Sequence, residues 1–138
     1  MNRALVIGMA LSMAAAESSG AGLTPKTNYQ LHCMGCHGDT GRSDPTRVPS
    51  INQTFVEFAA TPEGRDYLAR VPGIASAPLD DVDLTALLNW LFASLKSAGG
   101  EQIFSVAEVA TARRHPLADV TAARKRAQAG RWPDAARP

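Results

Sequence analysis

The chain is short of several residue types that would otherwise narrow its class. It has only two Cys and three His in 138 residues, which leaves a zinc centre of about four such ligands almost nothing to use. Aromatic residues make up 6%, which is lean for packing a core, and the net charge of +1 argues against nucleic-acid binding. The chain is otherwise 45% hydrophobic and 20% charged, so we expect one ordinary globular domain, with an appendage.

One stretch carries most of the recognisable chemistry: Cys33-Met34-Gly35-Cys36-His37. The pattern C-x-x-C-H is the attachment signature of a c-type haem. Two thiols three positions apart on one helical turn can each add across a vinyl group of one porphyrin, and His37 can then bind the iron as proximal ligand through a neutral imidazole nitrogen. A bare C-x-x-C can also be half of a zinc site, a redox dithiol or a disulfide. The adjacent His favours one covalent haem c.

Residues 1–16 have the pattern of a secretory signal, which also favours haem because c-type haem is attached outside the cytoplasm. Arg3 gives a positive start, residues 4–11 are apolar, and residues 14–16 form a small-residue cleavage site. An uncleaved anchor is the alternative, but the apolar run falls short of the ~20 residues that span a bilayer. We therefore expect a periplasmic protein with no transmembrane segment after signal cleavage.

Capping residues predict an all-α fold. Thr24, followed by Pro25, opens a helix that runs into the cysteine motif and ends at Gly38. Asn52 is expected to cap a second helix, and Thr61 to open a third.

The second half continues the helical pattern. Residues 74–78 read as a loop, and residues 80–96 as the strongest helix, with three Asp at its start and leucines at helical spacing. Ser105 begins a capping box for a helix to about Arg114, and residues 116–128 are predicted to form the last helix.

Two stretches before and within the strongest helix point to a family. They are Pro78-Leu79-Asp80-Asp81, which is similar to the P-L-S-D opening of a final helix, and Leu88-Asn89-Trp90-Leu91, which carries an aromatic late in it. With the C-x-x-C-H motif, residues 25–97 resemble the class I monohaem cytochrome c family. The resemblance implies a cytochrome c-like helical fold around one covalent haem. It assigns residues 17–100 to the haem domain and residues 101–138 to an extra basic helical extension.

The resemblance also implies roles for single residues. Trp90 and Tyr29 are expected to meet where the first and last helices of the family fold cross. The Pro49 carbonyl is expected to accept a hydrogen bond from the second ring nitrogen of His37, which would fix its tautomer. Arg47, in the loop just before Pro49, is a candidate partner for a haem propionate.

The chain departs from this family at the sixth iron ligand, which is usually a Met of the distal loop. Of four Met, only Met34 remains after the signal, and the loop reads Ala75-Ser76-Ala77. His32 is tethered to the proximal side, which leaves His115 as the candidate distal ligand or as a surface residue. An open or water-bound site, a ligand lent by a partner, and weak ligation by Ser76 are the alternatives.

Charge is divided along the chain. Residues 38–108 contain five basic and ten acidic residues, whereas residues 109–138 contain seven basic and two acidic ones. The basic cluster either packs back on the acidic haem domain or docks a redox partner. Its members are Arg113, Arg114, Arg124, Lys125 and Arg126.

The main functional hypothesis is a periplasmic c-type cytochrome, not itself an enzyme, that carries single electrons between periplasmic donor and acceptor proteins. One alternative is a five-coordinate haem protein that binds CO, NO or O₂, or a weak peroxidase. Another is the cytochrome subunit of a periplasmic dehydrogenase complex. Because a Met/His ligand pair raises the reduction potential, we expect its absence to lower it.

Overall fold

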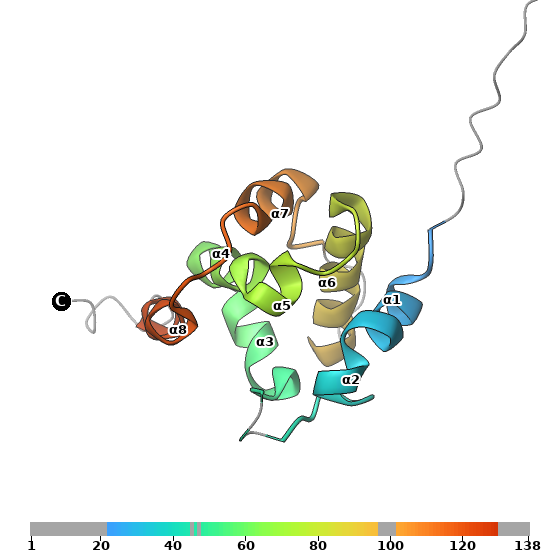
Figure 1. Ribbon diagram of the computed structural model, residues 1–138, viewed down its shortest axis with the longest axis horizontal. Coiled ribbons are helices and arrows are strands. Elements are labelled where there is room, and N and C mark those ends of the chain that lie inside the picture. Colours follow the sequence, from blue (N-terminus) through green and yellow to red (C-terminus); the bar gives the residue numbers. More distant parts are fainter. Residues whose placement is uncertain (1–21, 45, 47, 97–101, 130–138) are drawn as a thin grey trace, which may run out of the picture.

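The structure, a computed structural model, describes residues 22–44, 46, 48–96 and 102–129 (Figure 1). Within these ranges the chain forms eight helices and no strand, which confirms the predicted all-α fold. In the same ranges no helix is long and apolar enough to cross a membrane. The helices are α1 (Pro25–His32), α2 (Met34–His37), α3 (Ile51–Ala59), α4 (Pro62–Arg70), α5 (Pro72–Ala75), α6 (Asp81–Lys96), α7 (Val106–Arg113) and α8 (Val120–Ala129).

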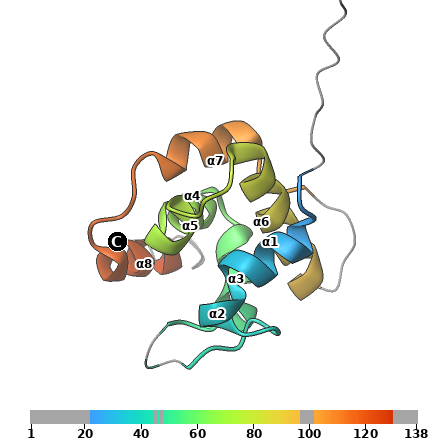
Figure 2. The same ribbon diagram turned by 45° about the vertical axis from the view of Figure 1, so that its right-hand side comes forward.

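Two helices organise the packing. The longest, α6, contacts α1, α3 and α7, and α4 contacts α3, α7 and α8. In both views of the molecule α7 lies at the top, with α8 on the left and α1 to its right (Figures 1 and 2). One hydrophobic core runs through these contacts and includes Phe104 and Val109 before and within α7, and Ala123 and Ala127 of α8. Helices α7 and α8 of the extension therefore share the core of residues 22–96.

Three predicted helix starts are confirmed by their caps. The side chains of Thr24, Thr61 and Ser105 accept hydrogen bonds from the backbone N–H three residues on, at 3.2, 3.0 and 3.2 Å. These bonds satisfy N–H groups that a helix leaves unpaired at its start. The strongest predicted helix is also confirmed, as α6, where the Asp80 carboxylate accepts from the Asp83 N–H at 2.7 Å.

The prediction that Asn52 caps a helix is wrong. Helix α3 starts one residue earlier, at Ile51, after Ser50 in the N-cap position. The reason lies across the loop, because the Gly41 carbonyl accepts from the N–H groups of Ile51 and Asn52 at 3.0 and 3.3 Å. A distant carbonyl thus does the work expected of a local side chain.

Two other boundaries differ. The predicted loop 74–78 begins inside α5, because Pro72 occupies a first helical position, where its missing N–H costs nothing. The last helix starts at Val120 rather than at residue 116. Before this helix, the Leu117 N–H donates to the Arg70 carbonyl at 3.0 Å, which holds residue 117 outside helical geometry. The Asp119 carboxylate then caps the helix by accepting from the Ala122 N–H.

Candidate functional site

The cysteine motif lies on a single turn between α1 and α2. Cys33 continues the hydrogen bonding of α1, with its N–H 2.9 Å from the Tyr29 carbonyl, but its φ of −124° and ψ of −37° leave helical geometry. The Cys33 carbonyl then accepts from the N–H groups of Cys36 and His37 at 3.2 and 3.0 Å. The backbone therefore gathers the two thiols and the imidazole on one turn.

This turn is anchored at Gly38. The Tyr29 hydroxyl donates to the Gly38 carbonyl at 2.7 Å, and Gly38 has a φ of +66°, which side chains rarely tolerate. A Cβ there would also lie 2.7 Å from the Arg42 carbonyl oxygen. Tyr29 itself packs on Trp90 of α6, with ring centroids 5.8 Å apart and a tilt of 51°. The expected meeting of Tyr29 and Trp90 is confirmed, and it ties the turn to the longest helix.

Cys33, Cys36 and His37 line a common hollow of about 110 Å³, which we call the cysteine hollow. His32 and Tyr29 of α1 complete the side that carries the motif. The remaining walls come from α3, α5, the loop before α6, and α6 itself, and are almost entirely aliphatic. They are formed by Ile51, Gly73, Ile74, Ala77, Leu84, Leu87, Leu88 and Leu91.

His37 also lines a second hollow of about 90 Å³, which we call the Pro49 hollow. The two hollows share His37 and Ile51, so they lie on either side of these two residues. The second is more aromatic than the first and reaches α8. Its other lining residues are Pro49, Thr54, Phe55, Phe58, Tyr67, Leu68, Val71 and Arg124.

The surroundings of His37 favour a neutral imidazole. Burial lowers the pKa of His37, and the nearby Pro49 carbonyl opposes this shift. The Nδ1 atom is buried and has no hydrogen-bond partner, so the expected hydrogen bond to the Pro49 carbonyl is not formed, although that carbonyl is near enough to affect the pKa. A buried polar atom without a partner is rare and calls for an explanation. A neutral imidazole facing a carbonyl is the arrangement that metal-ligating His residues use, with the carbonyl fixing the tautomer.

The surroundings of Cys33 do not activate its thiol. Burial, and then the neighbouring Cys36, raise the pKa of Cys33. Reactive cysteines in C-x-x-C redox motifs instead have lowered pKa values, because the thiolate is the nucleophile. A zinc site also lacks ligands, since in the described part of the chain no three His, Cys, Asp or Glu side chains gather as a metal site would require.

The other candidate residues are dispersed. Pro49 lines the hollow behind His37, and His32 lines the cysteine hollow while remaining exposed. His115 is exposed in a separate hollow between α4 and α7, beside Asp66, and lines neither hollow that contains His37. Arg47, like the signal, lies outside the described residues.

Two arginines of the basic cluster, Arg113 and Arg124, pack against the rest of the chain. The Arg124 side chain lines the Pro49 hollow, with its guanidinium carbon 6.0 Å from the Phe58 ring centroid. Arg113 pairs with Asp81 at 3.1 Å and is only 14% exposed. For these two the packing role is confirmed, whereas Arg114, Lys125 and Arg126 are exposed. The sequence did contain a signal for the position of Arg124. Ala123 and Ala127 are four residues apart, as expected for the buried face of a helix, and Arg124 follows Ala123 directly, at the edge of that face.

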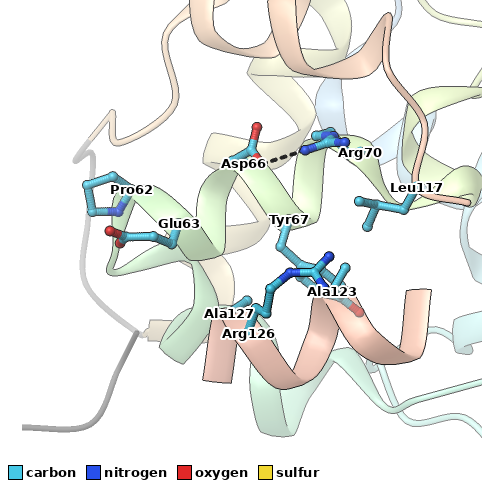
Figure 3. Close-up of a pocket in the computed structure, with 9 residues that line it drawn as sticks. All are labelled: Pro62, Glu63, Asp66, Tyr67, Arg70, Leu117, Ala123, Arg126 and Ala127. Atoms are coloured by element: carbon cyan, nitrogen blue, oxygen red, sulfur yellow. Dashed lines mark hydrogen bonds and ion pairs between the residues drawn. The ribbon is translucent and has the colours of Figure 1, made fainter. Parts of the chain in front are cut away.

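A larger hollow of about 500 Å³ lies between α4 and α8 (Figure 3). The Asp66–Arg70 ion pair, at 3.1 Å, lies along α4. Pro62 and Leu117 lie at opposite ends of the hollow in Figure 3. Its lining contains no thiol or imidazole. Among the hollows described here, the residues of the motif line only the two around His37.

No protein-family model, curated protein or solved structure matches the chain. The assignment of a function consequently rests on the geometry of the motif and the hollows.

Proposed function

We propose that this protein is a periplasmic c-type cytochrome that carries single electrons by means of one covalent haem. The observation that supports this most is the placement of Cys33, Cys36 and His37 on one turn that lines an otherwise aliphatic hollow. Each thiol would add across a vinyl group, so that a C–S bond forms and the thiol hydrogen passes to the other vinyl carbon. This addition needs no oxidant.

The residues present fit the haem. Cys33 and Cys36 would hold the ring, and His37 would be the proximal ligand, with Pro49 behind it fixing the tautomer. When bound, haem supplies a reversible one-electron change at iron. The buried leucines of α6 give the hollow an apolar wall, and burial of a haem is one of the means by which a protein tunes its potential.

Transfer to partner proteins would use the exposed side of the motif. Cys36 and His32 are exposed beside the hollow, so a ring edge held there would be close to the surface. Electron donors and acceptors in the periplasm are the partners that this arrangement suits. The exposed Arg114, Lys125 and Arg126 lie on the extension rather than beside the motif, and they remain candidates for steering an acidic partner.

A second candidate function, the binding of CO, NO or O₂, is supported by the wall that faces the motif. Ile74 and Ala77, which precede α6, offer the cysteine hollow no oxygen, nitrogen or sulfur side-chain ligand, and Ser76 between them is exposed. Met34 is itself in the motif turn and 38% exposed. Because neither Ile74 nor Ala77 of this described wall can ligate iron, the sixth position would be open to a small ligand or water.

The attachment of haem is tested with a double variant, Cys33→Ala with Cys36→Ala. Exported with the haem-attachment machinery, the unchanged chain should keep its haem after acid–acetone extraction, and the double variant should lose it. The matched control is Met34→Ala, which changes the same turn between the two thiols and should retain the haem. Haem that survives extraction in the double variant would refute the proposal.

A further inference from the structure

Arg113, the last residue of α7, reaches the segment between α5 and α6 with an unusual number of hydrogen bonds. Its Nε and Nη2 donate to the Ala75 carbonyl at 3.2 Å each, and Nη2 also donates to the Ala77 carbonyl at 2.8 Å. Its Nη1 donates to the Leu79 carbonyl at 2.8 Å and to the Asp81 carboxylate at 3.1 Å. All three guanidinium nitrogens are therefore used on a segment of seven residues, 75–81.

The same segment contributes Ala77 to one wall of the cysteine hollow. Ala77 lines the hollow, as do Gly73 and Ile74 just before it, and the Ala77 carbonyl is one of the groups that Arg113 holds. The other hydrogen bonds of the segment are local backbone bonds, such as those from the Ala75 and Leu79 N–H groups to the Val71 and Ala77 carbonyls at 2.8 Å each, whereas Arg113 joins the segment to α7. The guanidinium is thus attached to the outside of the wall that the motif faces.

The extension presents Arg113 rigidly. Helix α7 packs on α4, α5 and α6, and its Val109 is fully buried in the core. The Glu108 carboxylate of the same helix accepts from Arg65 Nε of α4 at 2.9 Å. A planar guanidinium with five N–H donors can hold several carbonyls at once, which the single ammonium of a Lys cannot reproduce.

We infer that Arg113 is a positioning residue that clamps residues 75–79 as the closed wall of the cysteine hollow and thereby limits the access of small ligands to it. The role of the clamp in ligand access rests on the proposed haem, whereas its effect on the wall does not. Arg113 would then set how often the cysteine hollow opens, without itself lining that hollow. Removal of the guanidinium leaves the Ala75 and Leu79 carbonyls without this partner, and each lost charge-assisted bond favours the open wall.

The wall is tested by hydrogen exchange in the full-length chain. The N–H groups of Ala77 and Leu79 are bonded to the carbonyls of Ile74 and Ala77 at 3.1 and 2.8 Å, so they report opening of the segment. Arg113→Gln should speed their exchange by about tenfold or more, and Arg113→Lys by less. Arg114→Gln, which changes an exposed neighbour of the same charge, should leave both amides unchanged.

Ligand access is tested by the rate at which the ferrous protein binds CO after flash photolysis. We expect Arg113→Gln to raise the association rate several-fold and Arg114→Gln to leave it unchanged. Unchanged amide exchange in Arg113→Gln would overturn the clamp, and faster exchange with an unchanged CO rate would overturn its control of access. A chain that acquires no haem would refute the proposed function, and with it the control of access, while the exchange measurement still decides the clamp. If Arg113→Gln does not fold, Arg113→Lys provides both readouts.

Discussion

The two ends of the described chain contribute to the cysteine hollow in different ways. Helices α1 and α2 supply the thiols and the imidazole, and their hydrogen bonds join residues close in sequence, as between Tyr29 and Gly38. Helix α7 supplies no side chain to this hollow but holds its wall from outside, through bonds from Arg113 to residues 36 and 38 positions away. The reactive groups are thus placed by local backbone geometry, whereas the shape of the hollow depends on long-range packing.

Because the extension shares the core, we expect its deletion to destabilise the whole folded chain, although it lies far from the motif in sequence. Deleting residues 101–138 removes Phe104 and Val109, which are 2% and 0% exposed. Loss of a buried Phe alone costs about 3–5 kcal/mol, which approaches the whole stability of a small domain. We expect the shortened chain to lose its cooperative thermal unfolding transition, measured by circular dichroism. An unfolding midpoint equal to that of the full chain would contradict the shared core.

A single substitution in α7 tests whether this helix packs into the shared core. Val109→Ala removes two methyl groups from a fully buried position and should lower the free energy of unfolding by about 1–3 kcal/mol. Val106→Ala provides the matched control in the same helix, because Val106 is 42% exposed, and it should change stability by less than about 0.5 kcal/mol. Both are measured by urea denaturation. Equal effects of the two variants would show that α7 does not pack as described.

At the other end of the chain the expected loss is smaller and local. Tyr29→Phe keeps the ring against Trp90 but leaves the Gly38 carbonyl without the hydroxyl that donates at 2.7 Å. The free energy of unfolding should fall by about 1–2 kcal/mol. Urea denaturation measures this, and amide exchange of residues 36–38 should rise more than that of the extension. Unchanged stability would mean that the hydroxyl does not secure the turn.

The smallest expected effect concerns Tyr67, which borders both the Pro49 hollow and α8. Burial raises the pKa of Tyr67 above the ordinary 10.0, and the charge of Arg124 opposes this shift. Since the folded state holds this proton more tightly, the group's contribution to stability is present below pH 10 and is lost as the pH rises through the higher folded value.

The titration is measured by phenolate absorbance in the Tyr29→Phe background, which leaves Tyr67 as the only tyrosine of two. Arg124→Gln should raise the pKa of Tyr67 further, because it removes the opposing charge. A lower pKa in that variant would show that Arg124 does not face the ring.

The helices could be predicted from the sequence wherever their signals are local. Thr24, Thr61 and Ser105 cap helices with their own side chains, which is a matter of residues three positions apart. The start of α3 could not, because it depends on the Gly41 carbonyl across a loop. The predicted start of a loop at residue 74 was wrong for a related reason, since a Pro that follows one helix, as Pro72 follows α4, can also begin the next.

In the candidate site, too, the features set by local sequence could be predicted and those set by long-range contacts could not. The spacing of Cys33, Cys36 and His37 places them on one turn by itself, and the resemblance to a known family led to the contact between Tyr29 and Trp90. The role of Arg113 was hidden, because a basic residue late in a helix looks solvated until the segment that it meets is known. Charge division along the chain indicated only that the basic end would face acidic groups, and Asp81 is one of them.

The absorption spectrum of the ferrous protein, taken before and after CO is added, tests the central claim most directly. We expect a haem spectrum that is at least partly high-spin and that CO shifts readily, because no Met or His side chain of the described residues joins His37 in the cysteine hollow except the exposed His32. His115→Ala should leave both spectra unchanged, since His115 lies in the hollow between α4 and α7. A purely low-spin spectrum that CO does not alter would contradict the account.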